Sequence, residues 1–443
     1  MSAAFDATTD GALRSWIDVP DGSGFPIQNL PLGIVSRAYE SPRVGVAIGD
    51  SVLDLALIAE AGLLEDALPG ARAILTSGAL NAFLARGRGA WSALRARLSA
   101  LLSAGNEELR GAPGLTERAL YPRAQARMHL PFDVGDYVDF YSSIEHATNL
   151  GRLFRPGGEP LMPNYRHIPI GYHGRSGTIV VSGTPIVRPS GQRRPDPQQP
   201  PLFGPSRALD IELEVGFVTG PGNALGTPIP ASSAREHIYG MVLVNDWSAR
   251  DIQAWEYQPL GPFLGKSFAT SISPWVVSLD ALEPFRVEGP HQEPEPLPYL
   301  RTSGAWNYAI SLRIELQSAE MARRGLAPLT VSQPTFRRMY WNVAQQLAHA
   351  TANGAVVRPG DLFASGTVSD LEPDFGSFIE LTWRGTRPIR LPDGTQRAFL
   401  EDGDTVRLLG HAGGDDTPRI GFGEVSGRIV GADMGIKSTE VSP

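Results

Sequence analysis

Apolar and polar residues alternate along much of the chain, as they do in β-strands. Apolar residues at positions 44, 46 and 48 share one face of a predicted strand, Gly49-Asp50 supplies a turn, and residues 52–55 return, which predicts a hairpin. Further strands are predicted at 178–181, 211–217, 241–244 and 378–383, each bounded by turn-forming residues. Most of the chain after residue 127 is therefore predicted to be β-structure.

Helical spacing of apolar residues occurs in two segments. In 91–101 the apolar positions recur at intervals of three and four, and the polar positions between them, including Arg95, are expected to face away from the core. In 336–347 the same spacing predicts a second helix. Two proline-rich stretches, 188–205 and 284–298, are predicted to be long surface loops.

Composition and charge narrow the class of protein. The 443 residues are 42% apolar and only 19% charged, with 49 Gly and 38 Pro, which favours many turns around buried β-structure over disorder. Because the chain has no cysteine, it has no disulfide, no cysteine-based metal site and no thiol nucleophile. A net charge of −8, from 39 Lys and Arg against 47 Asp and Glu, and the lack of a basic run make nucleic acid an unexpected partner.

Neither the N-terminal segment nor the apolar runs carry a targeting signal. The first 16 residues lack a cationic stretch followed by an apolar core, so no signal peptide is predicted. No stretch approaches about 18 uninterrupted apolar residues, so we expect no membrane span and no membrane partner. The sequence therefore predicts a cytoplasmic protein, in which any bound metal is held by oxygen or imidazole.

The segment 209–217 carries the most informative pattern. Its apolar residues fall on one face of the predicted strand, and Asp210, Glu212 and Glu214 fall on the other. A solvated acidic face is the simpler interpretation of this strand alone. The alternative is that Glu212 and Glu214, about 6.6–6.8 Å apart along the strand, bind one hard cation. Asp246, at the polar end of the apolar run 241–244, is either a helix N-cap or a further ligand of that site.

Residues 136–149, DYVDFYSSIEHATN, place Asp139 and His146 among aromatic and small polar residues, which is typical of a site lining. Taken singly, a histidine is more often structural than catalytic. The GxSxG, HExxH and GxxxxGK[ST] motifs are all absent, the last although a glycine-punctuated loop ends in Lys266. A serine hydrolase, a zinc peptidase and a nucleotide-binding protein are therefore unsupported.

Several long motifs together resemble the fumarylacetoacetate hydrolase (fumarylacetoacetase) family. Besides 136–149 they are LMPNYRHIPIGYHGR (161–175), LDIELE (209–214), NDWSARDIQAWEYQPLGPFLGKSF (245–268), RPGDLFASGT (358–367) and the hairpin PRVGVAIGDSVLDL (42–55). The resemblance extends from about residue 15 to residue 433. It implies a β-rich α+β fold, with a small SH3-like N-terminal barrel over residues 1–125 and a large mixed β-roll catalytic domain over residues 126–443. It also implies a homodimer.

The resemblance implies an activity and its cofactor. The family hydrolyses the carbon–carbon bond of 4-fumarylacetoacetate to fumarate and acetoacetate in tyrosine and phenylalanine breakdown, with bound Ca²⁺ or Mg²⁺. Residues that match the family's metal ligands are Asp139, Glu212, Glu214 and Asp246, and a second cation position matches the neighbourhood of Lys266 and Thr270. A lysine ammonium cannot ligate a cation, so Lys266 would offer only its backbone carbonyl there.

The resemblance also implies residue roles. The matching catalytic residues are His146, as the base that activates water, Glu380, which orients it, and Arg250, Gln253 and Lys266 around the developing oxyanion. The matching substrate contacts are Tyr141, Arg155, Tyr172, Gln253, Tyr257 and Thr367. These roles are chemically consistent, because a neutral histidine fixed by a carboxylate can activate water near its reference pKa of ~6.5. Oxygen-only ligands favour a hard cation over zinc.

Two other functions remain open. One is a related acylpyruvate hydrolase or 2-oxoacid decarboxylase of the same superfamily, although such relatives generally lack the N-terminal extension and the full 136–149 motif. The other is a non-catalytic, cation-stabilised protein that binds an acidic metabolite. His146 and Glu380 count against that second function, because a structural cation site needs no base.

Overall fold

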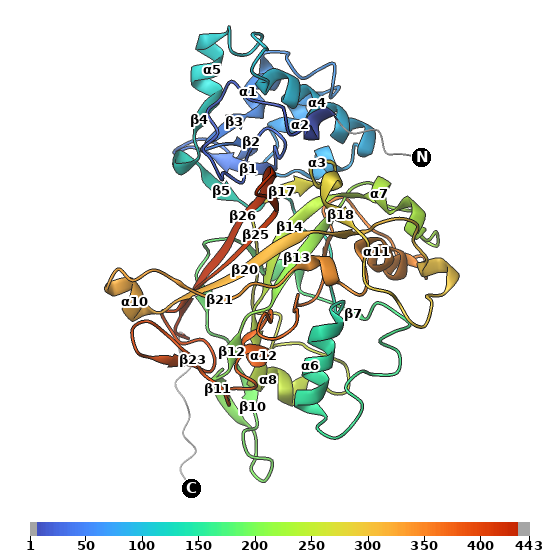
Figure 1. The fold of residues 1–443 in the computed structure, drawn as a ribbon, viewed down its shortest axis with the longest axis vertical. Coiled ribbons are helices and arrows are strands. Elements are labelled where there is room, and N and C mark those ends of the chain that lie inside the picture. Colours follow the sequence, from blue (N-terminus) through green and yellow to red (C-terminus); the bar gives the residue numbers. More distant parts are fainter. Residues whose placement is uncertain (1–6, 433–443) are drawn as a thin grey trace.

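The computed structural model describes residues 7–432 of the chain. The first six residues of the N-terminal segment, and the end of the predicted catalytic domain from residue 433, lie outside the described residues. Figure 1 shows an N-terminal body, in blue, above a larger body crossed by long strands. The fold is mixed α+β and rich in sheet. Within residues 7–432 no helix is long and apolar enough to cross a membrane.

A 13-stranded sheet is the main element of the molecule. Its hydrogen-bonded path runs β4-β3-β2-β1-β17-β14-β13-β22-β6-β7, and β5, β8 and β16 pair off this path. The strands in path order are β4 (Leu120–Pro122), β3 (Ser51–Asp54), β2 (Arg43–Ile48), β1 (Leu32–Ser36), β17 (Trp275–Ser278), β14 (Ile238–Asp246), β13 (Leu213–Thr219), β22 (Leu362–Ala364), β6 (Tyr137–Phe140) and β7 (Gly171–His173), followed by β5 (Arg127–His129), β8 (Ile179–Val181) and β16 (Thr270–Ile272).

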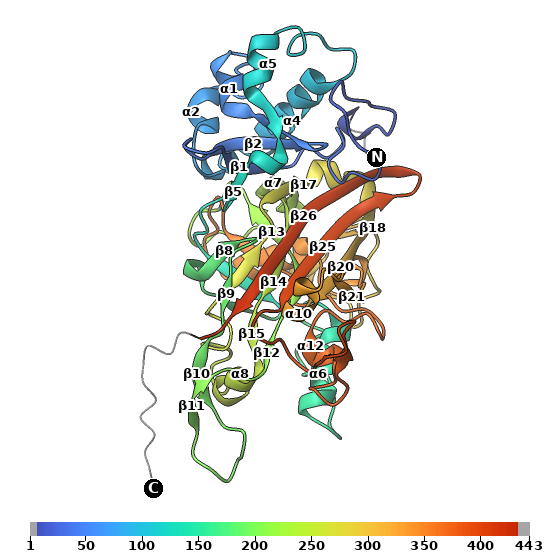
Figure 2. The ribbon, with the colours of Figure 1, turned by 90° about the vertical axis from the view of Figure 1, so that its left-hand side faces the viewer.

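A second sheet of five strands packs across the larger body, where β25 and β26 form its long hairpin (Figure 2). Its strands are β21 (Leu329–Ser332), β20 (Ile310–Gln317), β25 (Thr405–Gly414), β26 (Thr417–Val430) and β9 (Ile186–Val187). Four two-stranded ribbons complete the β-structure: β10 (Ser190–Arg193) with β11 (Leu202–Pro205), β12 (Leu209–Asp210) with β15 (Ser248–Ala249), β18 (Arg286–Val287) with β19 (Asn307–Tyr308), and β23 (Ile389–Arg390) with β24 (Gln396–Arg397). The described residues form no closed barrel, so the SH3-like barrel is not confirmed.

Helices are short and cover the edges and ends of the sheets. They are α1 (Leu55–Glu60), α2 (Ala71–Leu75), α3 (Asn81–Leu84), α4 (Arg88–Leu102), α5 (Pro113–Ala119), α6 (Ile144–Phe154), α7 (Ala234–His237), α8 (Arg250–Glu256), α9 (Leu279–Leu282), α10 (Ala319–Arg323), α11 (Val343–Thr351) and α12 (Phe378–Leu381). The predicted helix over 91–101 is α4, which buries its apolar stripe as expected. Arg95, however, is buried on the same helix and donates to the backbone carbonyls of Gln28 and Asn29.

The predicted hairpin over 44–55 is confirmed as β2 and β3. Gly49 forms the turn with a φ of 52°, and a Cβ there would lie 2.5 Å from the carbonyl oxygen of Asp18, so only glycine fits. Next to this hairpin, β1 pairs with β17 of the larger body, where Leu32 lies opposite Val276. The two bodies are therefore parts of one hydrogen-bonded sheet.

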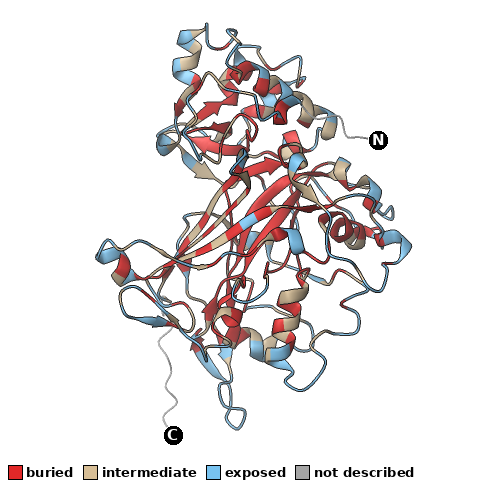
Figure 3. Cartoon of the chain, viewed as in Figure 1, coloured by how far each residue is buried: buried red, intermediate tan, exposed pale blue. Residues whose placement is uncertain are grey.

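The centre of that sheet is buried on both faces (Figure 3). Every residue of β13 and of β14 is buried, because the N-terminal body covers one side and the five-stranded sheet the other. The acidic residues of 209–217 therefore do not form a solvated face, since Asp210, Glu212 and Glu214 are all buried. Buried carboxylates need partners, and those partners define the site below.

Four predicted elements differ from the structure. Residues 378–383 are not a strand: α12 occupies 378–381, and Trp383 and Arg384 follow with positive φ. The helix predicted over 336–347 begins only at Val343, because Asn342 and Gln345 form a capping box that starts it there. Neither proline-rich stretch is all loop, since the ribbon of β10 and β11 lies within 188–205 and strand β18 lies within 284–298.

Candidate active site

Four carboxylates meet at the centre of the large sheet. Glu214 lies on β13 and Asp246 ends the neighbouring β14, Glu212 precedes β13, and Asp139 lies on β6, which β22 joins to β13. Each carboxylate is buried, and each offers a ligand oxygen within 4.8 Å of the others. The structure thus brings together all four carboxylates that the sequence motifs single out, although 107 positions separate Asp139 from Asp246.

Cationic side chains cover one side of this group of four carboxylates. Lys266 Nζ donates to Glu212 Oε2 and to Asp246 Oδ2, each at 2.6 Å. Arg250 Nη1 lies 2.8 Å from Glu212 Oε1. Burial acts to raise the pKa of Glu212, but the nearby Lys266 and Arg250 outweigh it and hold that pKa below its usual range.

On the other side, Asp139 and Glu214 have no such partner. Burial, with repulsion from neighbouring carboxylates, raises the pKa of both well above their usual values. Asp139 Oδ1 and Glu214 Oε1 are buried without a hydrogen-bond partner among the described residues. Two buried carboxylate oxygens without hydrogen-bond partners, in a group whose possible metal ligands are all oxygens, fit a hard divalent cation.

At the predicted second cation position, the side chains of Lys266 and Thr270 act as hydrogen-bond donors. Lys266 directs its ammonium at carboxylates, as described above, and so acts on this group as a fixed positive charge. Thr270, on β16, donates its hydroxyl to Asp246 Oδ1 at 3.1 Å. Both residues therefore lie beside Asp246, and in this structure both donate to it.

His146 and Glu380 form a buried pair next to the carboxylates. Ser143 caps α6 by accepting a hydrogen bond from the backbone N–H of His146, which fixes the first turn. His146 Nδ1 lies 2.6 Å from Glu380 Oε2, and both side chains are almost fully buried. A carboxylate partner favours the proton on Nδ1, which leaves Nε2 as the acceptor. The Tyr141 ring and the imidazole pack in a T-shaped contact with centroids 5.3 Å apart.

Glu380 is surrounded by further donors. Asn149 Nδ2 donates to Oε1 at 2.9 Å, and the hydroxyls of Ser369 and Ser377 donate to Oε2 at 2.9 and 2.7 Å. Burial acts to raise the pKa of Glu380, but His146 and these donors outweigh it and lower that pKa. The motif analysis missed Asn149, Ser369 and Ser377. Local spacing could have found two of them: Asn149 lies three residues after His146 on one helix, and Ser377 lies three residues before Glu380. Ser369, eleven positions before Glu380, has no such signal.

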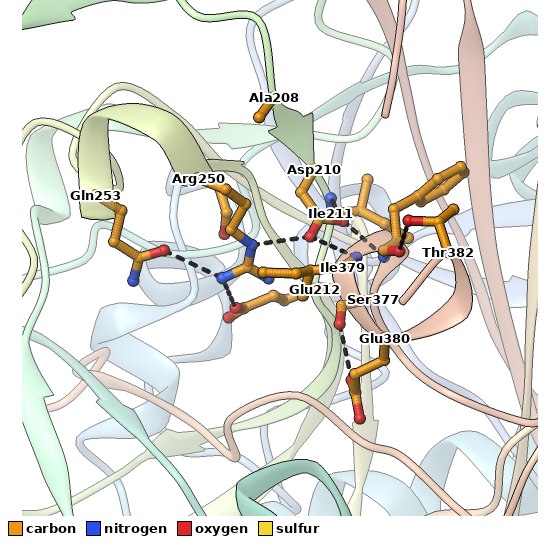
Figure 4. A network of polar contacts seen from close by, with 12 residues as sticks. Ala208, Asp210, Ile211, Glu212, Arg250, Gln253, Ser377, Ile379, Glu380 and Thr382 are labelled. Atoms are coloured by element: carbon orange, nitrogen blue, oxygen red, sulfur yellow. Dashed lines mark hydrogen bonds and ion pairs between the residues drawn. The ribbon is translucent and has the colours of Figure 1, made fainter. Parts of the chain in front are cut away.

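Arg250 and Gln253 lie on α8, which starts directly after the ribbon of β12 and β15. Arg250 Nη1 donates to Gln253 Oε1 at 3.1 Å as well as contacting Glu212, and its Nε donates to Asp210 Oδ2 at 2.8 Å (Figure 4). Burial acts to lower the pKa of Arg250, but the carboxylates of Asp210 and Glu212 outweigh it and raise that pKa. Arg250 Nη2 is buried without a partner among the described residues, which leaves it free to bind another acceptor.

The predicted substrate contacts divide into two groups. Tyr172 donates its hydroxyl to Asp246 Oδ2 at 3.0 Å, and Thr367 has a buried, unpartnered Oγ1 within the described residues. Together with Tyr141 and Gln253 they border the buried site. Arg155 and Tyr257 are exposed instead, and their polar atoms bind the Pro160 carbonyl and the Gln258 amide.

Comparison with known proteins places the chain in a family. Residues 137–430 match the family model of the fumarylacetoacetate (FAA) hydrolase C-terminal domain, and residues 28–131 match that of the fumarylacetoacetase N-terminal domain. The chain belongs to the fumarylacetoacetate hydrolase family. The resemblance seen in the motifs is thereby confirmed, and the four carboxylates, His146 and Glu380 all lie within the first of these matches.

Relatives in this family match over nearly their whole length. The chain is 51% identical over 420 residues to the fumarylacetoacetase of Rattus norvegicus, which covers 94% of this chain and 99% of that protein. It is 48% identical over 425 residues to the fumarylacetoacetase of Oryza sativa subsp. japonica, with 95% and 98% covered. A putative HpcE protein from Mycobacterium smegmatis shares the fold, with 19% identity, a TM-score of 0.51 and 90% of this chain against 99% of that chain.

Proposed function

We propose that this protein hydrolyses the carbon–carbon bond of 4-fumarylacetoacetate to fumarate and acetoacetate, a step of tyrosine and phenylalanine breakdown. The observation that carries the proposal is the buried His146–Glu380 pair, 2.6 Å apart, beside four clustered carboxylates. Fumarylacetoacetases about half identical to this chain over nearly all of both sequences support the choice of substrate. A base next to a cation site is what water-driven cleavage of a diketone needs.

The first chemical step in this proposal is activation of water by His146. Nε2 takes a proton from water, and the resulting hydroxide adds to the carbonyl carbon at the fumaroyl end of the substrate. Glu380 holds the imidazole in the correct tautomer and stabilises the imidazolium that forms. Because three donors besides His146 keep Glu380 ionised, it serves this role without taking the proton itself.

The second step breaks the carbon–carbon bond. The oxyanion re-forms a C=O bond as the carboxyl group of fumarate, while the electron pair of the broken bond stays with the methylene carbon as the enolate of acetoacetate. Protonation of that carbon gives its methyl group. The new carboxyl group loses its proton to solvent, and the proton taken up by His146 passes through solvent to restore the proton donor. Arg250 Nη2 is a free donor for the oxyanion, and the Gln253 amide and the Lys266 ammonium lie on the same side; we assign Lys266 as the proton donor to the carbanion. A divalent cation bound by the four carboxylates would supply Lewis-acid polarisation of the diketone oxygens.

The finer assignments belong to the same proposal. We assign the cation as Ca²⁺ or Mg²⁺, because the four candidate ligands offer only carboxylate oxygens. The residues that remain assigned as substrate contacts are Tyr141, Arg155, Tyr172, Gln253, Tyr257 and Thr367. The neighbourhood of Lys266 and Thr270 remains assigned as a second cation position. A homodimer, a cytoplasmic location and the division into domains at residues 125 and 126 remain predictions from the sequence motifs. Light scattering of the purified protein tests the dimer.

The test of the proposed function is a direct assay of the purified protein. With fumarylacetoacetate and Mg²⁺ or Ca²⁺, the diketone absorbance should disappear and fumarate should be released in equal amount. Excess chelator should stop the reaction, and either cation, added back, should restore it. No loss of the diketone with a cation present would refute the proposal. A larger kcat/KM on an acylpyruvate or on oxaloacetate would refute the choice of substrate.

A further inference from the structure

Asp210 is a buried carboxylate to which the chemistry above gives no role. It lies on β12, and its side chain is fully inaccessible to solvent. Four N–H groups donate to its two oxygens. Oδ1 accepts from the backbone of Ile211 and of Phe378, each at 2.7 Å, and Oδ2 accepts from Arg250 Nε at 2.8 Å and from the backbone of Ile379 at 3.0 Å. Every contact made by this carboxylate is therefore with a donor.

The four donors belong to two parts of the proposed catalytic machinery. Arg250 is the donor assigned to the oxyanion. Phe378 and Ile379 are the first two residues of α12, and Glu380 is the third. Figure 4 shows Asp210 between the guanidinium on one side and this helix on the other. One carboxylate thus holds the oxyanion donor and the helix that carries the partner of the base.

The contacts also decide which atom of Arg250 remains free. Asp210 holds Nε, and Glu212 and Gln253 hold Nη1, so that Nη2 alone is left buried and without a partner in residues 7–432. A guanidinium held at two of its three nitrogens is fixed in its plane. This fixed orientation presents Nη2 in one direction.

We propose that Asp210 is a positioning residue that fixes the side chain of Arg250 and the helix of Glu380 relative to each other. The proposal rests on the function proposed above. An asparagine cannot reproduce the arrangement, because its amide has one acceptor and one donor end. If the NH₂ group replaced Oδ2, it would face the donors of Arg250 and Ile379, and if it replaced Oδ1, it would face those of Ile211 and Phe378. Asp210→Asn must therefore disrupt one side.

The chain offers a matched control for this substitution. Asp404 is also fully buried, accepts from both Nε and Nη2 of Arg397 and accepts from the backbone of Glu401. It contacts none of the residues of the proposed site. Asp404→Asn therefore removes the same kind of buried charge from an aspartate–arginine pair outside the site.

The experiment measures kcat, KM and cation affinity for both variants, corrected for the folded fraction. Asp210→Asn should lower kcat about 10²-fold with little change in KM, because Arg250 and Glu380 act on the transition state. Binding of Mg²⁺ or Ca²⁺ alone, followed by calorimetry, should be unchanged, since Asp210 is not among the four carboxylates. Asp404→Asn should keep kcat within about twofold of the wild type. A kcat for Asp210→Asn equal to that of Asp404→Asn would overturn the proposal.

A second pair of variants tests whether Asp210 connects Arg250 with α12, and it can be measured even if Asp210→Asn alone does not fold. Arg250→Gln removes the positively charged guanidinium. Adding Asp210→Asn removes the second charge of the buried ion pair as well, and proteins tolerate the loss of both charges better than the loss of one. The double variant should have a lower kcat than Arg250→Gln, because Asp210 also holds the first two backbone N–H groups of α12, the helix that carries Glu380. A kcat equal to that of Arg250→Gln would contradict this connection. Since all variants are compared with an active wild type, an inactive wild type would instead refute the proposed function.

Discussion

Glu214 and Glu380 are both buried glutamates of the same site, yet their surroundings shift their pKa values in opposite directions. Glu380 accepts hydrogen bonds from an imidazole, an amide and two hydroxyls, and its pKa is lowered. Glu214 accepts one bond, from the backbone N–H of Gly366, while its other oxygen has no partner among the described residues, and its pKa is raised. Burial is common to both residues, so their neighbours decide the direction: the surrounding carboxylates repel a charge on Glu214, whereas His146 and the hydrogen-bond donors favour a charge on Glu380.

The difference distinguishes the surroundings of Glu380, which the protein completes by itself, from those of Glu214, which need a further positive charge. The protein alone supplies everything that keeps Glu380 ionised. The carboxylates of Glu214 and Asp139 lie close together in the buried interior, where a proton or a cation can balance their charge. A bound divalent cation would therefore act on the Glu214 side of the site and leave the Glu380 side unchanged.

The largest effect is expected from His146→Ala, which removes the proposed base and leaves Glu380 with its other three donors. Turnover of fumarylacetoacetate should fall about 10³-fold or more, because general-base catalysis is lost. The variant should still fold, with a lower melting temperature, because buried Glu380 loses its hydrogen bond to His146. His349→Ala serves as the control, since His349 lies on α11 and contacts Tyr299 outside the site. Substantial activity of the His146 variant would show that another group activates the water.

A smaller effect is expected from Glu214→Gln, which should stabilise the cation-free protein and weaken cation binding. The neutral amide relieves repulsion, so the cation-free protein should melt at a higher temperature than the cation-free wild type. Affinity for Ca²⁺ or Mg²⁺ should fall by at least about tenfold, and the rise in melting temperature on adding the cation should shrink. Glu424→Gln, in a half-exposed pair with Arg407, should change neither. An unchanged cation affinity would mean that Glu214 is not a ligand.

The smallest effect is expected from Ser377→Ala, which removes one donor from Glu380 and so raises its lowered pKa. The acid limb of the kcat/KM profile should move by about one to two units to higher pH, since a hydrogen bond to a carboxylate is worth about 1.5–3 kcal/mol. The stabilisation from ionised Glu380 is present above its unfolded pKa of ~4.3 and is lost as the pH falls through its lower folded value. The variant should therefore gain less stability across that range.

Ser332→Ala is the matched control for Ser377→Ala, because the Ser332 hydroxyl is buried and has no partner within the described residues. It should leave the pH profile unchanged. If Ser377→Ala left the acid limb in place, that limb would report a group other than Glu380.

Much of the site was predictable because its residues lie in long motifs or on regular strands. Alternation in 209–217 correctly places Glu212 and Glu214 on one face, but it cannot show that this face is buried. That burial comes from the N-terminal body and the five-stranded sheet, which are remote in sequence. The contact of Asp210 with Phe378, across 168 positions, is equally invisible to a local pattern.

The error at 378–383 has a physical cause. A run of six residues with alternating apolar positions fits a strand and a short buried helix equally well. The helix forms here because Asp210 accepts from its first two backbone N–H groups, and it ends at the positive φ angles of Trp383 and Arg384. The spacing of Ser377 and Glu380, S-x-x-E, is a local signal for a helix start and favours the observed structure.

The pairing of β1 with β17 has a consequence for how the protein comes apart. β17 is hydrogen-bonded on its other side to β14, the strand that ends in Asp246. Loss of the N-terminal body would leave β17 as an open edge strand one step from the carboxylates. The segment up to residue 131, which supplies none of the site side chains named here, thus shares one cooperative unit with the catalytic centre. Heat or denaturant should melt scaffold and site together.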